Sequence, residues 1–429
     1  MKGREETRRT ALGLVAAAPL AACAGQRGPN APLRFWAMGR EGEVVQRLIP
    51  AFEAANPGLR VEVQQLPWSA AHAKLLTAFA GGDLPDLCQV GNTWLPEFAA
   101  LGALEPLDAR VAASAIVRPA DGFEGVWRTN TVDGVLCGVP WYVDTRLLFY
   151  RRDLLEKAGH GAAPATWAQW LDAMEAVKSL VGKGAWAALL PLNEPEPLLT
   201  LALQQSDPLL RDGGGRGNFQ SAGFKRALGF YGDIFRRGLA PPSSSTEIGN
   251  LYDEFDRGAF CFYVTGPWNL GEFRRRLPAA RQDIWMTAPM PGPDGPGAGI
   301  AGGASLVVFQ GGGRADPAWR LIEHLATFQA QSRFCALTGD LPARRDVWRG
   351  APLASDLEAA AFRDQLTRVR PTPQVPEWER ITLEMQLVAE QMVRGGLPVD
   401  AATQEMDRRA DGLLEKRRWM LAREGKSAT

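Results

Sequence analysis

The sequence predicts an α/β fold that is spread over more than one domain. A short apolar run at 33–37 is followed by apolar residues at helical spacing over 45–52, and Val61 and Val63 then alternate with polar neighbours. A strand, a helix and a strand in this order predict a parallel βαβ unit. The chain has 429 residues, which at roughly 100–200 residues per domain gives two or three domains.

The same alternation continues along the chain. Pro50 lies inside the first helical pattern and is expected to kink that helix. Thr166 and Gln169 have the spacing of a capping box, which predicts that a helix begins at Trp167. The other expected elements are helices at 70–80, 94–101, 319–330, 356–367, 379–393 and 400–421, strands at 86–90, 186–190, 259–264 and 306–309, and Pro- and Gly-rich joints at 212–218 and 289–303.

The composition excludes several classes of function. The chain carries 48 basic and 48 acidic residues, whereas a nucleic-acid-binding protein needs a positive surface, so we expect no nucleic-acid partner. There are only 3 His, and the common nucleotide, zinc and nucleophile motifs are absent. We therefore expect no metal and no cofactor, although two catalytic carboxylates that meet only in the folded chain stay an alternative. The 14 Trp, against 5 Tyr, exceed what core packing easily explains.

The first residues have the pattern of an export signal. A basic start is followed by an apolar run at 10–22, which is too short to span a bilayer, so residues 1–22 are predicted to be a signal peptide. The run ends at Cys23, as in a bacterial lipoprotein signal, so we expect Cys23 to carry a lipid and 23–30 to be a tether. A chance cysteine is the alternative. Arg8 and Arg9 leave open whether export uses the general or the twin-arginine route.

Four further cysteines follow Cys23. They are Cys88, Cys137, Cys261 and Cys335, and none has CxxC spacing. The first three lie in mostly apolar, strand-like sequence, so we expect buried free thiols. Cys88 with Cys137 is the one pair that would merit a check for a disulfide.

Five segments, in this order, resemble the extracellular solute-binding proteins of ABC sugar importers, the group that includes maltose- and trehalose-binding proteins. The resemblance covers roughly residues 31–415. The most specific segment runs from Val139 through Trp141-Tyr142-Val143-Asp144 to Leu154. The other segments are 82–87, 260–268, 290–292 with 302–303 downstream, and 341–345.

The resemblance implies a two-lobed α/β fold in which the chain crosses between the lobes three times, near 141–147, 300–306 and 338–344. Lobe one would comprise 31–141 and 303–340, and lobe two would comprise 145–300 and 343–425. The ligand would lie in the cleft between the lobes, and binding would close them about the hinge.

A sugar ring offers flat C–H faces that pack on indoles and hydroxyls that need polar partners. The positions that match the family's pocket are of these two kinds. We expect the following residues to bind the ligand: Arg40, Glu41, Trp68, Asn92, Thr93, Trp94, Tyr142, Asp144, Glu194, Trp268, Gly302, Gly303, Arg344 and Trp378.

Several of these positions have a structural alternative. Arg40 and Glu41 could be a solvated helix start, and Asn92 could cap a helix. Trp68 could pack within a lobe, and Arg344 could pair across the lobes. Thr93 stands where an acid is common in the family and Glu196 where an aromatic is common, so both leave the particular sugar open.

The remaining tryptophans are expected elsewhere. Trp141, next to the first crossing, could belong either to the cleft or to the core. Seven others are interpreted as core residues: Trp127, Trp167, Trp170, Trp285, Trp319, Trp348 and Trp419.

The function implied is a carbohydrate-binding lipoprotein that captures a di- or oligosaccharide and delivers it to an ABC permease. It would be an exported monomer, held at the membrane by its lipid and facing the periplasm or the cell exterior, and it would catalyse no reaction. The alternatives are a secreted carbohydrate-active hydrolase or lyase with the same cleft, and a binding lipoprotein coupled to a sensor.

Overall fold

The computed structural model describes residues 31–311, 313–350 and 352–423. The predicted signal peptide (1–22), Cys23 and the predicted tether (23–30) lie outside the described residues. Within those ranges no helix is long and apolar enough to cross a membrane.

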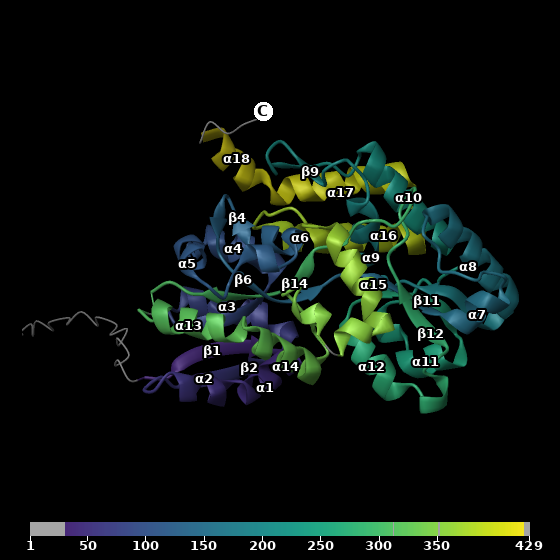
Figure 1. Ribbon diagram of the computed structural model, residues 1–429. Helices are drawn as coiled ribbons and strands as arrows, with labels where there is room; N and C mark the ends of the chain where they lie inside the picture. The colour runs from purple at the N-terminus through teal and green to yellow at the C-terminus, as the bar shows by residue number, and fades with distance from the viewer. Residues whose placement is uncertain (1–30, 312, 351, 424–429) are drawn as a thin grey trace, which may run out of the picture.

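Two β-sheets form the centres of two halves of the molecule (Figure 1). The larger sheet has the strand order β15-β6-β14-β3-β1-β2 and the smaller has the order β12-β7-β11-β8. β1 pairs in parallel with β2 and with β3, so the predicted βαβ unit is confirmed. The strands are β1 (Leu33–Met38), β2 (Val61–Leu66), β3 (Leu87–Gly91), β6 (Val139–Asp144), β7 (Leu147–Arg151), β8 (Trp186–Leu189), β11 (Phe260–Thr265), β12 (Trp285–Ala288), β14 (Gly302–Val308) and β15 (Leu341–Pro342).

Helices cover both sheets. Apolar residues of α1 (Gly39–Val44), α2 (Ile49–Ala55), α13 (Ala315–Leu325) and α14 (Phe328–Thr338) share one core with the larger sheet, and α3 (Trp68–Ala80) and α4 (Leu95–Ala100) share a second. The helices α7 (Arg152–Lys157), α8 (Trp167–Val181), α9 (Glu196–Leu203), α10 (Ala222–Arg236), α11 (Leu251–Arg257), α12 (Trp268–Arg276), α15 (Leu357–Gln365), α16 (Trp378–Gly395) and α17 (Val399–Leu413) contribute to the core around the smaller sheet. α6 (Glu124–Arg128) also contributes Val126 to this core, and the remaining α-helices are α5 (Asp108–Ala113) and α18 (Glu415–Arg423).

The chain passes from one sheet to the other three times. β6 belongs to the larger sheet and β7 to the smaller, so the first passage is at 145–146. The second lies between β12 and β14, and the third follows β15. A short parallel pair, β13 (Gly299–Ile300) with β16 (Val369–Arg370), lies beside the second passage. The two sheets thus give the two-lobed arrangement. β15, which precedes the third passage, belongs to the larger sheet. The proposed limits of the lobes stay a prediction.

Three predicted helices differ from the structure by more than one or two residues at their ends. Pro50 does not kink a helix but lies at the start of α2, where the missing N–H costs nothing. The predicted helix 319–330 is two helices, because Thr327 caps α14 by accepting a hydrogen bond from the N–H of Ala330 (3.2 Å). The predicted helix 400–421 is interrupted at Leu414 and becomes α17 and α18. The joint at 212–218 includes a small hairpin, with β9 at Leu210–Arg211 and β10 at Arg216–Gly217.

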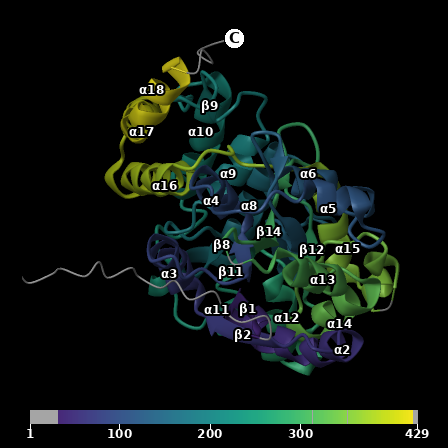
Figure 2. The same cartoon turned by 90° about the vertical axis from the view of Figure 1, so that its left-hand side faces the viewer.

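Most tryptophans predicted to be core residues are buried, and Trp141 joins them in the core of the larger sheet. Trp419 contradicts the prediction, because its side chain is 58 % exposed. It lies on α18, which extends beyond the body of the molecule in Figures 1 and 2. An apolar residue at helical spacing is buried only where another element covers it. Trp127, which was also predicted to be a core residue, is half-buried.

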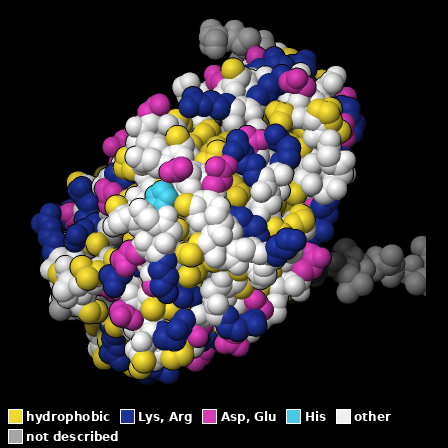
Figure 3. Space-filling model, turned by 90° about the vertical axis from the view of Figure 1, so that its right-hand side faces the viewer, with side chains coloured by type: hydrophobic (Ala, Val, Ile, Leu, Met, Phe, Trp, Pro, Cys, Tyr) yellow, Lys and Arg dark blue, Asp and Glu magenta, His cyan; other side chains and the backbone are white. Residues whose placement is uncertain are grey.

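The four cysteines within the described residues are free thiols, as expected, and only Cys335 is not fully buried. Burial raises the pKa of Cys88 well above its usual value. No group of histidine, cysteine and carboxylate side chains in the described part of the chain could hold a metal ion. Acidic and basic side chains are interspersed over the face drawn in Figure 3, which fits the balanced charge of the sequence.

Candidate functional site

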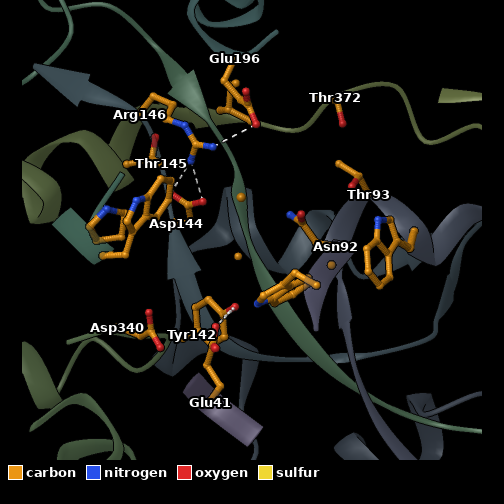
Figure 4. Close-up of a pocket in the computed structure, with 18 of the residues that line it drawn as sticks. Glu41, Asn92, Thr93, Tyr142, Asp144, Thr145, Arg146, Glu196, Asp340 and Thr372 are labelled. Atoms are coloured by element: carbon orange, nitrogen blue, oxygen red, sulfur yellow. Dashed lines mark hydrogen bonds and ion pairs between the residues drawn. The ribbon is translucent and has the colours of Figure 1, made fainter. Parts of the chain in front are cut away.

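A cavity of about 640 Å³ lies between the two sheets. Its wall is built from the segments that follow β1 and β3, the first and second passages between the sheets, the ends of α14 and β16, and the starts of α9, α12 and α16. Of the predicted ligand-binding residues, these line the cavity: Arg40, Glu41, Trp68, Asn92, Thr93, Trp94, Tyr142, Asp144, Trp268, Gly302, Gly303 and Trp378. Figure 4 shows a close-up of it.

Two indoles form an aromatic wall on the side of the larger sheet. Trp68 begins α3, and Trp94 ends the short 3₁₀ helix (Asn92–Trp94) that follows β3. Their rings meet edge to face with centroids 5.6 Å apart. His72 packs on Trp94 at 5.0 Å and its Nε2 lies 2.7 Å from Glu97 Oε2, so a second layer fixes Trp94 in place. A rigid indole wall suits the apolar face of a ring-shaped ligand.

Glu41 is held by a chain of hydrogen bonds that reaches into the core. The Tyr142 hydroxyl donates to Glu41 Oε1 (2.8 Å), and Gln89 Nε2 donates to the Tyr142 hydroxyl (3.2 Å). The N–H of Met38, at the end of β1, donates to Gln89 Oε1 (2.7 Å). The Glu41 side chain is therefore fixed by structure rather than solvated, with the residue only 8 % exposed.

A second carboxylate, Asp340, lies in the same part of the cavity and was not predicted. It follows α14, and its N–H donates to Thr338 Oγ1 (3.0 Å). Burial, with the nearby Glu41 as the next cause, raises the pKa of Asp340 to about 8. Two carboxyl groups in a poorly hydrated place favour a ligand that donates hydrogen bonds to them.

Arg146 joins the two sides of the cavity and was also not predicted. It lies in the first passage between the sheets, where Nη1 is 2.7 Å from Asp144 Oδ2 and Nη2 is 3.0 Å from Glu196 Oε1. Its guanidinium carbon lies 4.5 Å from the ring centroid of Trp268. Figure 4 shows Arg146 between the two carboxylates. One face of Trp268, predicted to stack on a sugar, is therefore already covered by Arg146.

Glu194 and Arg344 do not line the cavity. α9 begins at Glu196, so the carboxylate of Glu196 reaches the cavity and Glu194 stays in the preceding turn. Burial and the neighbouring Glu196 raise the pKa of Glu194 to about 7.

Arg344 contacts other parts of the protein instead. Its Nη2 lies 2.6 Å from Asp346 Oδ2, and its Nη1 donates to the carbonyls of Ile116 (3.0 Å) and Ala326 (3.3 Å). With every arm of the guanidinium engaged, Arg344 fixes the segment after the third passage.

Gly303 shows why the second passage needs glycine. Its φ is 129°, and a Cβ atom there would lie 2.3 Å from the carbonyl oxygen of Tyr142. β14 can therefore approach β6 closely at the cavity wall. Asn92 Nδ2 donates to the carbonyl of Ala301 (2.8 Å), so this predicted ligand contact also fixes the second passage.

Several other polar residues of the wall were not predicted to bind the ligand. Thr145 and Arg146 lie within the family segment at the first passage, and the others reach the cavity from helix termini and from segments distant in the chain. They are Thr145, Arg146, Glu272, Arg275, Thr338, Asp340, Thr372, Glu379 and Thr382.

The fold and the site define a class of protein: a two-lobed binding protein that holds a solute between its lobes. The chain belongs to the bacterial extracellular solute-binding proteins, because that family's model matches residues 37–332. It is 56 % identical to MalE, the sugar-binding protein of Xanthomonas citri, with a TM-score of 0.89 over 91 % of this chain and 99 % of that one.

More distant relatives are named for, or were solved with, other solutes. The diacetylchitobiose-binding protein DasA of Streptomyces coelicolor is 22 % identical, with 82 % of each chain covered. UgpB of Mycobacterium tuberculosis, solved with glycerophosphocholine, is 21 % identical, with a TM-score of 0.76 over 90 % of this chain and 99 % of that one. The fold alone therefore does not determine which solute is bound. The side chains that line the cavity must determine it.

Proposed function

We propose that this protein binds a di- or oligosaccharide in the cavity between its lobes and delivers it to an ABC permease. The observation that carries the proposal is the pairing of an indole wall, Trp68 and Trp94, with the fixed carboxylate of Glu41 and the half-buried Asp340. The likeness to a protein named as sugar-binding, at 56 % identity, supports the same ligand class.

The size and charge of the cavity support this ligand class. Small-molecule sites have volumes of about 300–1,000 Å³, and the cavity of about 640 Å³ falls within that range. Arg146 is neutralised by Asp144 and Glu196, so it is not free to hold an anion. The hydroxyl groups of a sugar can donate hydrogen bonds to the carboxylates of the wall and accept hydrogen bonds from its arginine.

Binding would proceed by capture and closure. One lobe takes the sugar, and the passages at 145–146 and beside β13 act as the hinge when the other lobe closes on it. The closed form docks on the permease. The protein catalyses no reaction, so the sugar leaves unchanged.

Export and anchoring belong to the same proposal. After removal of residues 1–22, Cys23 would carry the lipid, and 23–30 would connect the anchor to β1. The chain would act as a monomer on the outer side of the membrane that carries it.

The test is a titration of intrinsic tryptophan fluorescence with a panel of disaccharides and oligosaccharides. We expect a saturable change with at least one of them and full recovery of that sugar after prolonged incubation. Hydrolysis products would favour the carbohydrate-active enzyme. A response only to polyamines or glycerophosphodiesters would overturn the proposed ligand class. Docking on a sensor but not on the permease would favour the sensor-coupled lipoprotein.

A further inference from the structure

A second cavity, of about 620 Å³, lies apart from the interlobe cavity and is lined by arginines. Arg128, at the end of α6, lines it from one side, Arg370 of β16 from another, and Arg417 of α18 from a third. Of the residues that line the interlobe cavity, Thr372 alone also lines this one. The second cavity is therefore a separate site, and we call it the arginine cavity.

These three arginines differ from most others in the chain. Most other arginines among the described residues pair with carboxylates, as Arg151 does with Asp153 (2.7 Å). Within 31–311, 313–350 and 352–423, Arg128, Arg370 and Arg417 form no ion pair. Arg370 donates only to the carbonyls of Leu203 and Gln205, both at 2.9 Å.

The wall also holds buried donors that lack a partner. Arg417 Nε and Gln205 Nε2 are buried and have no acceptor among the described residues. Gln205 is only 8 % exposed. A buried N–H without an acceptor costs roughly 1–3 kcal/mol, so such groups call for an explanation. An anion in the cavity would supply acceptors at this wall.

Two acidic residues also line the arginine cavity. Asp207 is engaged, because its Oδ2 accepts the N–H of Gly223 (2.7 Å) at the start of α10. Asp133 lies in the turn between β4 (Thr131–Val132) and β5 (Val135–Leu136), with a φ of 49°. Three arginines against these two carboxylates leave the wall with net positive charge.

We propose that the arginine cavity binds a phosphate group, carried by a phosphorylated solute or by a phospholipid headgroup. Guanidinium groups match the geometry of phosphate oxygens and remain charged at all working pH values. The volume of the cavity exceeds what a free phosphate ion fills, so the phosphate belongs to a larger molecule. The site is independent of the sugar cavity and does not depend on the proposed transport function.

The test compares inorganic phosphate with potassium chloride at equal ionic strength, by calorimetry on the purified protein. We expect phosphate to bind, and the double variant Arg128→Gln/Arg417→Gln to bind it at least tenfold more weakly, because each lost guanidinium removes about a factor of ten. Neither side chain makes a hydrogen bond within the described residues, so the variant should fold; circular dichroism checks this. Arg320→Gln, on α13 and outside the cavity, is the matched control.

Vesicles separate the two sources of phosphate. The protein with Cys23→Ser is mixed with vesicles of phosphatidylglycerol or of phosphatidylcholine, and sedimentation is measured. Binding to phosphatidylglycerol that needs Arg128 and Arg417 identifies a headgroup, whereas binding of inorganic phosphate alone identifies a solute. The proposal is wrong if phosphate acts no differently from chloride and no vesicle binds, or if the double variant behaves like Arg320→Gln.

Discussion

The guanidinium of Arg146 lies 4.5 Å from the ring centroid of Trp268, at the passage between the two lobes. Asp144 and Glu196 hold it there. Because Trp268 begins α12 beside the smaller sheet and Asp144 ends a strand of the larger one, this contact joins the two halves at the cavity wall. The relative position of Arg146 and Trp268 should therefore affect how the lobes close on a ligand.

Arg146→Gln should weaken sugar binding at least tenfold. The change leaves two carboxylates uncompensated in a poorly hydrated wall and removes the cation that orients Trp268. Dissociation constants from fluorescence titration check this, at a temperature at which the variant is folded. Arg152→Gln is the control, since Arg152 pairs with Glu156 on an exposed helix surface at 3.7 Å. Equal affinities of the two variants would contradict the prediction.

Trp94→Phe should weaken sugar binding by about tenfold, and Trp94→Ala by more. A lost or reduced stacking surface at the indole wall costs roughly 0.5–1.5 kcal/mol beyond area burial. Trp419→Ala is the matched control, because Trp419 lies on α18, far along the chain, and is 58 % exposed. Calorimetry checks all three variants. If Trp419→Ala reduced affinity as much as Trp94→Ala, the indole wall would not be the binding surface.

Asp340 predicts a pH dependence of stability in the ligand-free protein. Its pKa is raised from 3.8 to about 8, so the folded state favours the protonated acid. The stability that this group contributes is full below about pH 3.8 and is lost as the pH rises through about 8. Asp340→Asn should therefore gain stability over the wild type as the pH rises from 5 to 8, by about 1 kcal/mol or more.

Urea unfolding of both proteins at several pH values checks the Asp340 prediction. Asp346→Asn is the control: hydrogen bonds from Arg344 lower the pKa of Asp346, so this carboxylate is ionised throughout pH 5–8 and the substitution should lower stability by an amount that does not vary over that range. A difference between Asp340→Asn and the wild type that does not vary with pH would show that Asp340 is ionised throughout.

Arg344→Gln should lower stability without changing sugar affinity. Its guanidinium is engaged by Asp346 and by the carbonyls of Ile116 and Ala326, and it does not line the cavity. Losing charged hydrogen bonds should cost about 1–3 kcal/mol. Thermal unfolding and a sugar titration on the same sample separate the two effects. A large loss of affinity at unchanged melting temperature would restore Arg344 as a ligand contact.

Cys23→Ser should release the protein from the membrane fraction. A serine hydroxyl cannot take the thioether-linked lipid, so the exported chain would lose its proposed anchor. Fractionation of cells that express wild type or variant checks this, and Cys335→Ser, at a half-buried position in the folded body, is the control. Membrane retention of Cys23→Ser would contradict lipid anchoring at that residue.

Much of the cavity wall followed from the sequence because of where parallel strands end. Glu41 and Asn92 come directly after β1 and β3, and the carboxyl ends of such strands meet at one edge of a sheet. The order of strand and polar residue in the sequence therefore predicts that Glu41 and Asn92 lie at this edge of the sheet, even when their hydrogen-bond partners are not known. The first passage, by contrast, was implied by the family resemblance of the segment around Tyr142 and Asp144.

Other residues could not be found from local pattern. Asp340 meets Glu41 only because α14 returns to the larger sheet far along the chain. Glu194 and Glu196 are both acidic residues in one turn, and only the start of α9 decides which one faces the cavity. Trp419 has apolar character at helical spacing, but it is 58 % exposed, with the guanidinium of Arg423 from the same helix 4.5 Å from its ring centroid. Each case depends on tertiary contacts that spacing does not encode.

The most direct test of the proposed function is a crystal structure of the protein with the sugar that gives the strongest fluorescence response. We predict one intact sugar between the two sheets, with a ring face within about 4 Å of Trp94 or Trp68. We also predict hydroxyl oxygens within about 3 Å of the carboxylates of Glu41 or Asp340. A sugar bound outside this cavity, a cleaved sugar, or a cavity that holds a ligand other than a carbohydrate would contradict the proposal.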